Sequence, residues 1–410
     1  MYKYRNITEK LKKSLSIYPV ILIGGARQVG KTTLVKNVLA DQGYTYYTLD
    51  DRSTLLFAQR DPQGFIENLS GPVVIDEIQR VPELLLAIKY VSDQEPKAGR
   101  FVITGSANPM LLPSVADSLR GRIAILNVHP FSQGEFRGIK DDFLKYAFSE
   151  DNFDTISSKI KTENYSKNIV FRGGYPINIL DDEQNRIDWF KNYTDIVLLK
   201  DLEDISNIQN IRYFETLLSL LVARVGNLLN ISETARDGKM SSSTVGRYIS
   251  LLEALYLINT QTNWSNNLTT RIIKSPKIYF NDTGLLTSLL DMEMEKLFSS
   301  SIWGAVLENF IFMELEKQLT WSIIDAKLSH FRTTSGTEID IIAEKRDGTI
   351  VGIEVKASAS VSPSDLQGLK YLKAKIGDKF HKGIIFYTGK QFLSLGDKFY
   401  AVPIAGLWAN

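Results

Sequence analysis

The sequence predicts a multidomain α/β protein. Short apolar runs suited to buried strands alternate with helical stretches over residues 1–130. A mainly helical middle follows, and strand patterns return in residues 296–410. Alternating strands and helices are typical of a mainly parallel sheet that is covered on both faces. We therefore expect boundaries near residues 130, 205 and 295.

Composition excludes several classes of protein. The 48 basic and 47 acidic side chains nearly cancel, so any contact with nucleic acid must depend on local patches. The chain has no cysteine, which excludes disulfides and thiolate metal sites and favours a cytoplasmic protein. No apolar run approaches the roughly 20 residues of a membrane span, so we expect no membrane segment. With three histidines, a carboxylate site for a divalent ion is favoured over a histidine-rich one.

The first predicted strand, residues 20–23, leads into a glycine-rich turn. Residues 25–32 have the spacing Gly-x4-Gly-Lys-Thr, which lets backbone N–H groups surround a phosphate at the start of a helix. Lys31 would reach the β- and γ-phosphates, and the Thr32 hydroxyl would ligate Mg²⁺. The predicted contacts with a nucleotide are Gly25, Ala26, Arg27, Gln28, Val29, Gly30, Lys31, Thr32 and Thr33. A glycine-rich turn that only caps a helix is the alternative.

Another apolar strand, residues 73–75, ends in Asp76 and Glu77. Open α/β sheets bind their ligands at the carboxyl ends of strands. We therefore expect Asp76 to orient the Mg²⁺ shell and Glu77 to polarise an attacking water as general base. A strand that ends at an ordinary acidic loop is the alternative.

Two later segments offer candidates for sensing phosphate charge. The strand at 101–105 ends beside Ser106, which we expect, with Thr104 as an alternative, to sense the γ-phosphate or the water; a plain N-cap fits almost as well. Arg120 and Arg122 precede the strand at 123–128 and could stabilise transition-state charge, in their own or a neighbouring subunit's site. A solvated helix end is equally compatible with these arginines.

These motifs together resemble a known group. Gly-Ala-Arg-Gln-Val-Gly-Lys-Thr-Thr at 25–33, Val-Ile-Asp-Glu-Ile-Gln at 74–79, Thr-Gly-Ser at 104–106 and Leu-Arg-Gly-Arg at 119–122 are similar to AAA+-superfamily ATPases of bacteria and archaea. That group carries a C-terminal domain of unknown function and lies near the STAND signalling ATPases. The resemblance implies an AAA-like domain at 1–130 that binds and hydrolyses ATP with Mg²⁺. It also implies a helical lid at 131–205, in which Pro176 packs against the adenine; a rigid Gly-Gly-Tyr-Pro turn is the alternative.

The pattern of helices and strands in residues 206–295 predicts a winged helix. A helical face at 217–222, a short helix at 231–236, a third helix capped near Ser241 and wing strands at 255–260 and 277–280 follow in order. The polar and basic positions expected to meet DNA are Ser242, Ser243, Arg247, Arg271, Lys274 and Lys277. A lid without nucleic-acid contact is the alternative.

The C-terminal region carries a second set of charged residues. Asp340, Glu354 and Lys356 have the spacing Asp-x13-Glu-x-Lys on two strands, and Glu308 lies on the preceding helix. The set resembles the PD-(D/E)xK nuclease core, which implies a second Mg²⁺ site at Glu308, Asp340 and Glu354 with Lys356 beside it. The Gln-x3-Tyr at 367–371 is similar to one nuclease branch.

The strand register tests this second site. A two-residue turn at 347–348 would place Asp340 and Glu354 on opposite faces of the sheet. A three-residue loop at 346–348, with Gly348 in the left-handed region, would place the two acids opposite each other. We expect this loop or a bulge. The alternative is an α/β domain whose charges are only solvated, or a nuclease fold retained for binding.

The favoured hypothesis is an ATP-binding and ATP-hydrolysing switch that controls a nuclease-like, DNA-binding domain. The alternative is a regulatory NTPase whose distal domains only bind a partner or nucleic acid. A small-molecule kinase is disfavoured, because the residues after the nucleotide domain show no small-substrate motif. A homo-oligomer is expected only if an arginine acts in trans, so the oligomeric state stays open.

Overall fold

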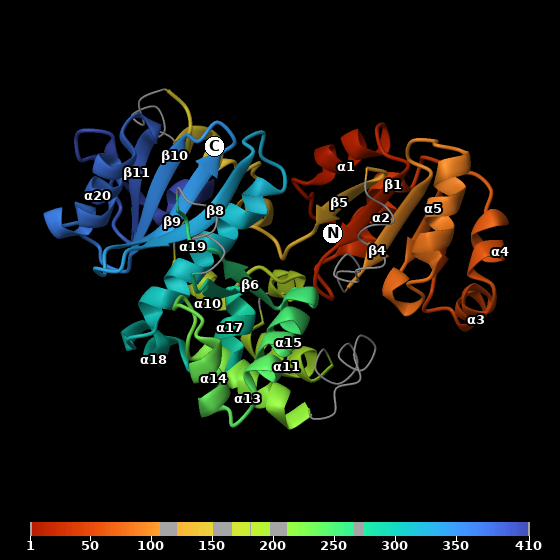
Figure 1. Ribbon diagram of the computed structural model, residues 1–410, viewed down its shortest axis with the longest axis horizontal. Coiled ribbons are helices and arrows are strands. Elements are labelled where there is room, and N and C mark those ends of the chain that lie inside the picture. The colour runs from red at the N-terminus through yellow and green to blue at the C-terminus, as the bar shows by residue number, and fades with distance from the viewer. Residues whose placement is uncertain are drawn as a thin grey trace.

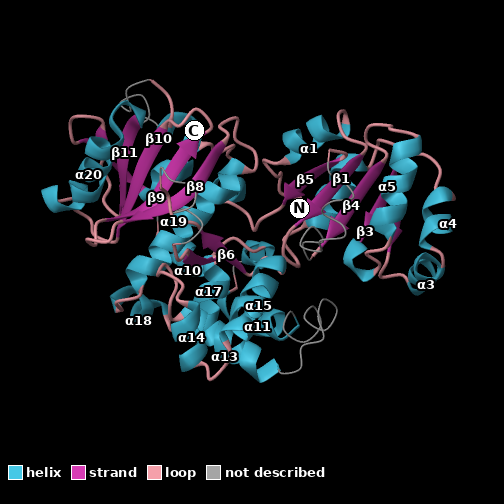
Figure 2. Cartoon of the chain, viewed as in Figure 1, coloured by secondary structure: helices cyan, strands magenta, loops and turns pink. Residues whose placement is uncertain are grey.

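The computed structural model of the protein describes residues 2–106, 121–150, 166–180, 182–196, 211–265 and 274–408. The chain forms three lobes, with the N-terminal lobe in red and orange, a mainly helical lobe in green and the C-terminal lobe in blue (Figure 1). Figure 2 shows that each of the two outer lobes contains a large sheet. The predicted multidomain α/β class, with a parallel sheet first and a separate C-terminal sheet, is confirmed.

The N-terminal sheet is parallel throughout. Its strands lie in the order β2-β3-β4-β1-β5. They are β1 (Val20–Gly24), β2 (Thr45–Thr48), β3 (Val73–Asp76), β4 (Phe101–Gly105) and β5 (Ile123–Asn127). The helices of this lobe are α1 (Thr8–Leu15), α2 (Lys31–Leu39), α3 (Arg52–Arg60), α4 (Pro62–Glu67) and α5 (Leu84–Gln94), with the 3-10 turn η1 (Ile78–Arg80).

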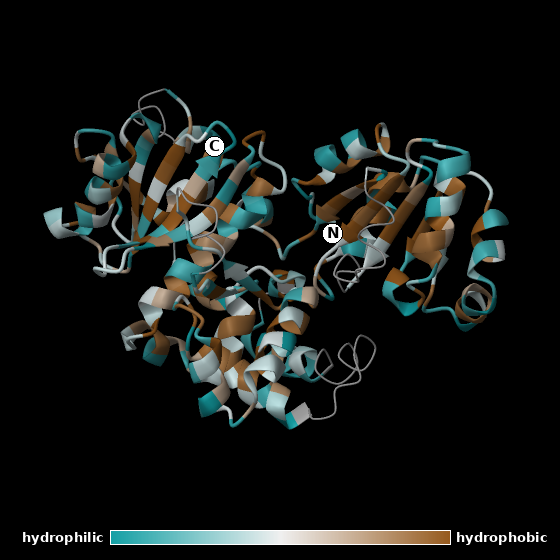
Figure 3. Cartoon of the chain, in the orientation of Figure 1, coloured by the Kyte–Doolittle hydropathy of each residue, from teal (hydrophilic) through white to brown (hydrophobic). Residues whose placement is uncertain are grey.

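Both faces of this sheet are buried, as expected from the apolar strands. Ile21 and Ile23 of β1 join one hydrophobic cluster, while Val20 and Leu22 join another. Successive strand residues point to opposite faces, so the two clusters lie on opposite sides of the sheet. The central strands of this sheet, such as β1 and β4, are accordingly brown in the hydropathy view (Figure 3).

The helical lobe contains α10 (Lys167–Arg172), η4 (Pro176–Leu180), α11 (Glu183–Ile196), α13 (Ile211–Val222), α14 (Ile231–Asp237), α15 (Ser242–Ala254), α17 (Thr283–Leu290) and α18 (Met294–Ser299). Strands β6 (Ile258–Gln261) and β7 (Lys277–Phe280) pair antiparallel. Ser241 caps α15 by accepting a hydrogen bond from the Thr244 N–H at 3.1 Å. The helices expected at 231–236 and after Ser241 are therefore present, whereas the strand expected at 255–260 begins three residues later, at Ile258.

The C-terminal lobe has a mixed sheet in the order β12-β13-β11-β10-β9-β8. Its strands are β8 (Ala326–Arg332), β9 (Glu338–Lys345), β10 (Ile350–Lys356), β11 (Phe380–Tyr387), β12 (Leu393–Ser394) and β13 (Phe399–Pro403). Helix α20 (Gln367–Ile376) packs on one face of β10, and α19 (Trp303–Leu319) also contacts β10. At Gly352 of β10 a side chain would meet the Leu369 methyl group of α20, so a larger residue there would displace side chains of α20.

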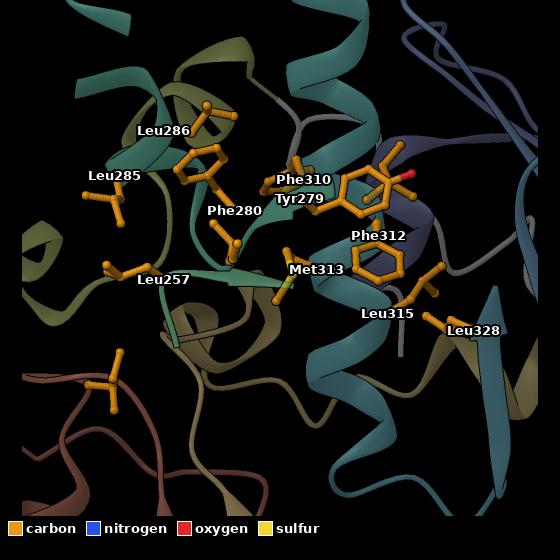
Figure 4. Packing of buried hydrophobic residues seen from close by; sticks show 14 of the residues in the cluster. Leu257, Tyr279, Phe280, Leu285, Leu286, Phe310, Phe312, Met313, Leu315 and Leu328 are labelled. Atoms are coloured by element: carbon orange, nitrogen blue, oxygen red, sulfur yellow. The ribbon is translucent and has the colours of Figure 1, made fainter. Parts of the chain in front are cut away.

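Helix α19 lies where the lobes meet. It contacts α17 and α10 of the helical lobe, β10 and η8 (Ile404–Trp408) of the C-terminal lobe, and α8 (Phe143–Ala147). Figure 4 shows the side chains of β7 packed beside those of α19, and the rings of Tyr279 and Phe312 stack with centroids 4.3 Å apart. None of the described helices is long and apolar enough to cross a membrane.

The segment predicted as one helical lid, residues 131–205, is divided in the structure. Helices α7 (Gln133–Arg137) and α8 begin it, and α8 packs against α19 and η8, whereas α10 and α11 pack against α17. The division depends on contacts with α17 and α19, which lie far later in the chain. Local sequence patterns carry no information about such partners.

Candidate functional site

The loop between β1 and α2 has an unusual backbone. Gly25, Gln28 and Gly30 have positive φ angles of 146°, 60° and 95°. A side chain at Gly25 would collide with the carbonyl group of Val128. Glycine is therefore required there, as expected for a loop that presents its backbone N–H groups to a phosphate.

Lys31 lies inside this loop. Its ammonium group donates hydrogen bonds to the carbonyl oxygens of Gly25 and Ala26, each at 2.8 Å, and the side chain is buried. These two carbonyl oxygens thus hold the Lys31 ammonium inside the loop that is predicted to bind phosphate. The rest of the predicted contact set, from Gly25 to Thr33, forms the loop and the first turn of α2.

Asp76, at the carboxyl end of β3, is the meeting point of three other elements. The Thr32 hydroxyl of α2 donates to its two oxygens at 3.1 and 3.3 Å. The hydroxyls of Tyr46 in β2 and Thr104 in β4 donate to the same carboxylate. Adjacent Thr32 and Asp76 oxygens fit the ligand preference of Mg²⁺. The predicted magnesium pair is thus brought together.

Tyr46 was not identified from the sequence. Burial and the nearby Asp76 raise the pKa of its hydroxyl, which therefore remains a proton donor. Only the sheet order, with β2 beside β3, reveals that residue 46 faces the acid. A tyrosine in a strand that is otherwise ordinary carries no such signal.

Glu77 has a left-handed backbone, with φ 64° and ψ 44°. Such a conformation costs about 1–3 kcal/mol in a residue other than glycine and occurs often at functional sites. The amide of Gln79 donates to the Glu77 carboxylate and, at 2.9 Å, to the Ser106 hydroxyl, which lies 3.5 Å from the same carboxylate. Glu77 and Ser106 are therefore neighbours, and Gln79 joins them.

The remaining candidates of the nucleotide site lie elsewhere. Arg120 is outside the described residues. Arg122 precedes β5 and forms an ion pair with Asp93 of α5, at the amino end of the sheet and opposite the P-loop edge. A parallel sheet places the starts and ends of its strands on opposite edges, so Arg122 lies away from the P-loop of its own chain. Its role in a neighbouring subunit's site stays a prediction.

Pro176 begins η4, after a turn tied to its neighbours. The Gly174 N–H donates to Asp282 at 2.6 Å, and the Gly174 carbonyl accepts from the Phe131 N–H at 2.7 Å. These contacts lie outside the P-loop. The role of Pro176 toward adenine stays a prediction.

The second predicted site depends on the β9–β10 register. Strands β9 and β10 pair antiparallel, with Ile353 opposite Ile341. A loop at 346–348 joins the two strands, and its Gly348 has φ 83°. The three-residue loop is therefore present as predicted. Asp340 falls opposite Glu354, and its carboxylate accepts a hydrogen bond from the Val355 N–H at 2.9 Å.

The four predicted residues gather in one cluster, together with two more. Lys356 forms an ion pair with Glu354 at 3.1 Å. Lys277 of β7 reaches Glu308 at 2.7 Å and Asp340 at 3.4 Å. The Tyr279 hydroxyl donates to Glu308 at 2.6 Å. We call these six residues the carboxylate cluster: Lys277, Tyr279, Glu308, Asp340, Glu354 and Lys356.

The position of Lys277 corrects the expectation that it adds to a DNA-binding surface. Its side chain is buried and paired with acids, because β7 begins against α19 rather than at the edge of a wing. Lys274 donates to the Arg332 carbonyl at 2.7 Å, and Arg271 is outside the described residues. Of the proposed DNA-facing set, Ser242, Ser243 and Arg247 are exposed on α15.

The cluster does not form a metal site in this conformation. Within the described ranges, no three His, Cys, Asp or Glu side chains are placed to hold one ion. Burial and Asp340 raise the pKa of Glu308, and burial and Asp340 likewise raise the pKa of Glu354. The Lys277 ammonium reaches both Glu308 and Asp340, and the second Mg²⁺ site stays a prediction.

Comparison with known proteins supports the first site. Residues 18–137 match the AAA domain, and residues 163–296 and 303–407 match two domains of unknown function. An uncharacterised protein of Mycobacterium tuberculosis is 27% identical over 402 residues, which cover 97% of this chain and 83% of that protein. Another, of Methanocaldococcus jannaschii, is 23% identical over 424 residues, covering 99% and 91%.

Among solved structures, a Walker-type ATPase of Pyrococcus abyssi aligns with a TM-score of 0.45 at 16% identity, over 71% of this chain and 96% of that one. The AAA match and the geometry of the P-loop define the N-terminal lobe as a P-loop domain of the AAA type. Together they support an ATPase of the AAA+ type.

Proposed function

We propose that this protein is a molecular switch in which ATP binding and hydrolysis in the N-terminal lobe control the C-terminal lobe. The observation that carries the proposal is the β1–α2 loop, which closes around Lys31. Beside it, the Thr32 hydroxyl donates a hydrogen bond to Asp76, and Glu77 follows Asp76 in the chain. Bound MgATP would supply a γ-phosphoryl group that can be transferred to water. The chain's own residues bind it, orient it and place the water.

Each residue has a distinct role in this proposal. When MgATP binds, Lys31 would exchange its two carbonyl acceptors for phosphate oxygens, and Thr32 and Asp76 would hold the magnesium. Glu77 accepts a proton from the attacking water, with Gln79 and Ser106 fixing its orientation. Tyr46 and Thr104 hold the Asp76 carboxylate in place.

A path of buried polar contacts leads away from this site. Arg5 donates to the Val29 carbonyl of the P-loop at 3.3 Å and pairs with Glu135 of α7 at 3.2 Å. From the same segment, the Gln133 N–H donates to Glu314 of α19 at 2.8 Å. A shift of the loop on nucleotide binding therefore has a connected route to α19, which also carries Glu308.

Two substitutions test the ATPase. Lys31→Ala is expected to abolish tight ATP binding, because it removes the charge at the phosphates. Glu77→Gln is expected to retain binding while hydrolysis falls by about 10²–10⁴-fold, the usual contribution of a general base. Calorimetric titration and phosphate release measure the two effects. Unchanged ATP affinity in Lys31→Ala would remove the P-loop assignment.

We further propose that the C-terminal lobe is nuclease-like and acts on DNA, with α15 contributing exposed polar residues. The alternative is a lobe that binds a partner or nucleic acid without cleaving it. The gathering of Asp340, Glu354 and Lys356 favours a nuclease. The ion pair between Lys277 and Asp340 favours a lobe that only binds. Magnesium-dependent cleavage by the wild type and by Glu354→Ala separates them. Equal cleavage by both, or none over varied DNA and RNA, would exclude a nuclease.

A further inference from the structure

Lys277 comes from a different part of the chain than the acids around it. It opens β7, which pairs with β6 and is bridged at Lys277 to Leu228, all within the helical lobe. Asp340 and Glu354 lie on the C-terminal sheet, and Glu308 lies on α19. The contact therefore joins two lobes through one ammonium group.

We infer that Lys277 acts as a tethered cation that fills the carboxylate cluster and keeps divalent ions out of it. The inference rests on the proposed function, because it describes how the second site of the switch is regulated. Glu308 and Asp340 are almost covered, with side chains 13% and 15% exposed, and the Lys277 side chain is 6% exposed. The lysine therefore occupies the space between the two acids that a divalent ion would need.

The charges in the carboxylate cluster favour the exclusion of divalent ions by Lys277. Buried carboxylates next to one another repel, so a cation between them stabilises the cluster. The Lys277 ammonium lies 2.7 Å from Glu308 and 3.4 Å from Asp340, so its positive charge offsets the charge of both acids. A divalent ion and the ammonium therefore compete for the same two acids, and only one of them can be bound there at a time.

The same competition links the cluster to lobe movement. Lys277 and Tyr279 both lie on β7, two positions apart. Withdrawal of β7 from α19 would therefore remove both side chains from the carboxylate cluster. The loss of the ammonium would leave the acids unpaired, so an entering divalent ion would stabilise the separated state. Such coupling is reciprocal, and ion binding would in turn favour the withdrawn hairpin.

The test measures Mn²⁺ binding to the full-length protein without nucleotide, by electron paramagnetic resonance of the free ion. Lys277→Met is expected to bind Mn²⁺ at least about tenfold more tightly than the wild type, because the competing cation is gone. Adding Asp340→Asn should remove that gain. Lys274→Met, a nearby lysine outside the cluster, is the matched control and should behave as the wild type.

Thermal unfolding gives a second readout. Mn²⁺ at millimolar concentration should raise the Tm of Lys277→Met by several degrees and leave that of the wild type nearly unchanged. If Lys277→Met does not fold, Lys277→Gln retains an N–H donor toward Glu308 and is measured instead. Equal Mn²⁺ affinity in wild type and variant, or no binding by either, would overturn the inference.

The two proposals for this site fail in different ways. Tighter Mn²⁺ binding by Lys277→Met without cleavage of any nucleic acid would keep the tethered cation and exclude a nuclease. Cleavage by the wild type, with Mn²⁺ affinity unchanged in the variant, would keep the nuclease and exclude the tethered cation.

Discussion

Single hydroxyl groups decide how Asp76 is oriented. Tyr46, Thr32 and Thr104 all donate to its carboxylate, so its two oxygens are held on three sides. A ligand that must point one oxygen at a magnesium ion benefits from this arrangement, because the hydrogen bonds select one rotamer before the ion arrives.

Tyr46→Phe is the most direct test of that role. Hydrogen bonds to charged groups contribute about 1.5–3 kcal/mol, so we expect Mg²⁺-dependent hydrolysis to fall by roughly tenfold while Mg²⁺-free ATP binding is retained. Tyr47→Phe, the adjacent strand residue on the opposite face, is the control. Steady-state assays over a range of Mg²⁺ concentrations measure the effect, and equal rates in the two variants would contradict it.

Acid sensitivity also has a source at one residue. Burial, with a smaller effect of Lys277, lowers the pKa of His330 from 6.5 to about 4. The unfolded chain takes up this proton first, so the stabilisation is complete above pH 6.5 and is lost as the pH falls toward 4. The loss should reach about 3 kcal/mol, at 1.36 kcal/mol per pH unit.

Urea unfolding between pH 7.5 and pH 4.5 measures this loss. His330→Gln should show a shallower decline of the unfolding free energy than the wild type. His381, which is half-buried, provides the comparison, and His381→Gln should change the slope less. Parallel curves for the wild type and His330→Gln would show that the acid sensitivity arises elsewhere.

Among the elements, α19 carries an unusual set of buried polar side chains. Its first turns provide the buried Asn309 beside the partly buried Glu308, and its last turns provide Glu314, Lys317 and Gln318. Each has a partner on another element. Lys317 donates to the Phe131 carbonyl at 3.0 Å, and Gln318 accepts from the Phe143 N–H at 2.7 Å. The helix is therefore held by directional bonds as well as by apolar packing.

Asn309 shows how specific these bonds are. Its amide accepts from the Phe280 N–H at 2.7 Å and donates to the Phe280 carbonyl at 2.8 Å. Asn309→Ala should cost about 2–3 kcal/mol, because it leaves buried backbone groups unpaired. Asn309→Asp should cost more, since it also buries a charge. Denaturant midpoints measure both, with the exposed Asn185→Ala as control; a loss below 1 kcal/mol for Asn309→Ala would contradict this account.

Much of the element structure was predictable from local patterns. The strand before Asp76, the Ser241 cap and the loop ending in Gly348 follow from residue types that favour one backbone geometry. The gathering of Asp340 with Glu354 followed from counting loop residues. Tyr46 and Lys277 were missed because their roles depend on which strand or helix lies next to them, and that choice is made by packing over long separations.

For the whole molecule, the main question is how nucleotide state reaches the C-terminal lobe. The route through Arg5, Glu135 and the 131–133 segment meets α19 at Glu314 and Lys317, which pair at 2.8 Å. This joint was not expected from the sequence, since residues 131–150 were assigned to a lid.

Hydrogen exchange tests the joint. ATP should change exchange rates across residues 303–319 in the wild type. Glu314→Gln combined with Lys317→Met removes both buried charges, so that neither is left alone, and should abolish that change while ATP affinity shifts by less than about threefold. Lys296→Met, exposed on α18, is the control. An unchanged exchange response in the double variant would mean that the signal travels by another route.

The same joint has a consequence for synthesis. Gln133 and its partner Glu314 are 181 residues apart in the chain. At a translation rate of about 5–20 residues per second, the 131–150 segment waits roughly 10–35 s for the helix that covers it. During that interval the polar groups and apolar side chains that α19 later buries remain exposed to solvent and to chaperones. Slower codons after residue 150 would lengthen this exposure, and the yield of folded protein should fall with them.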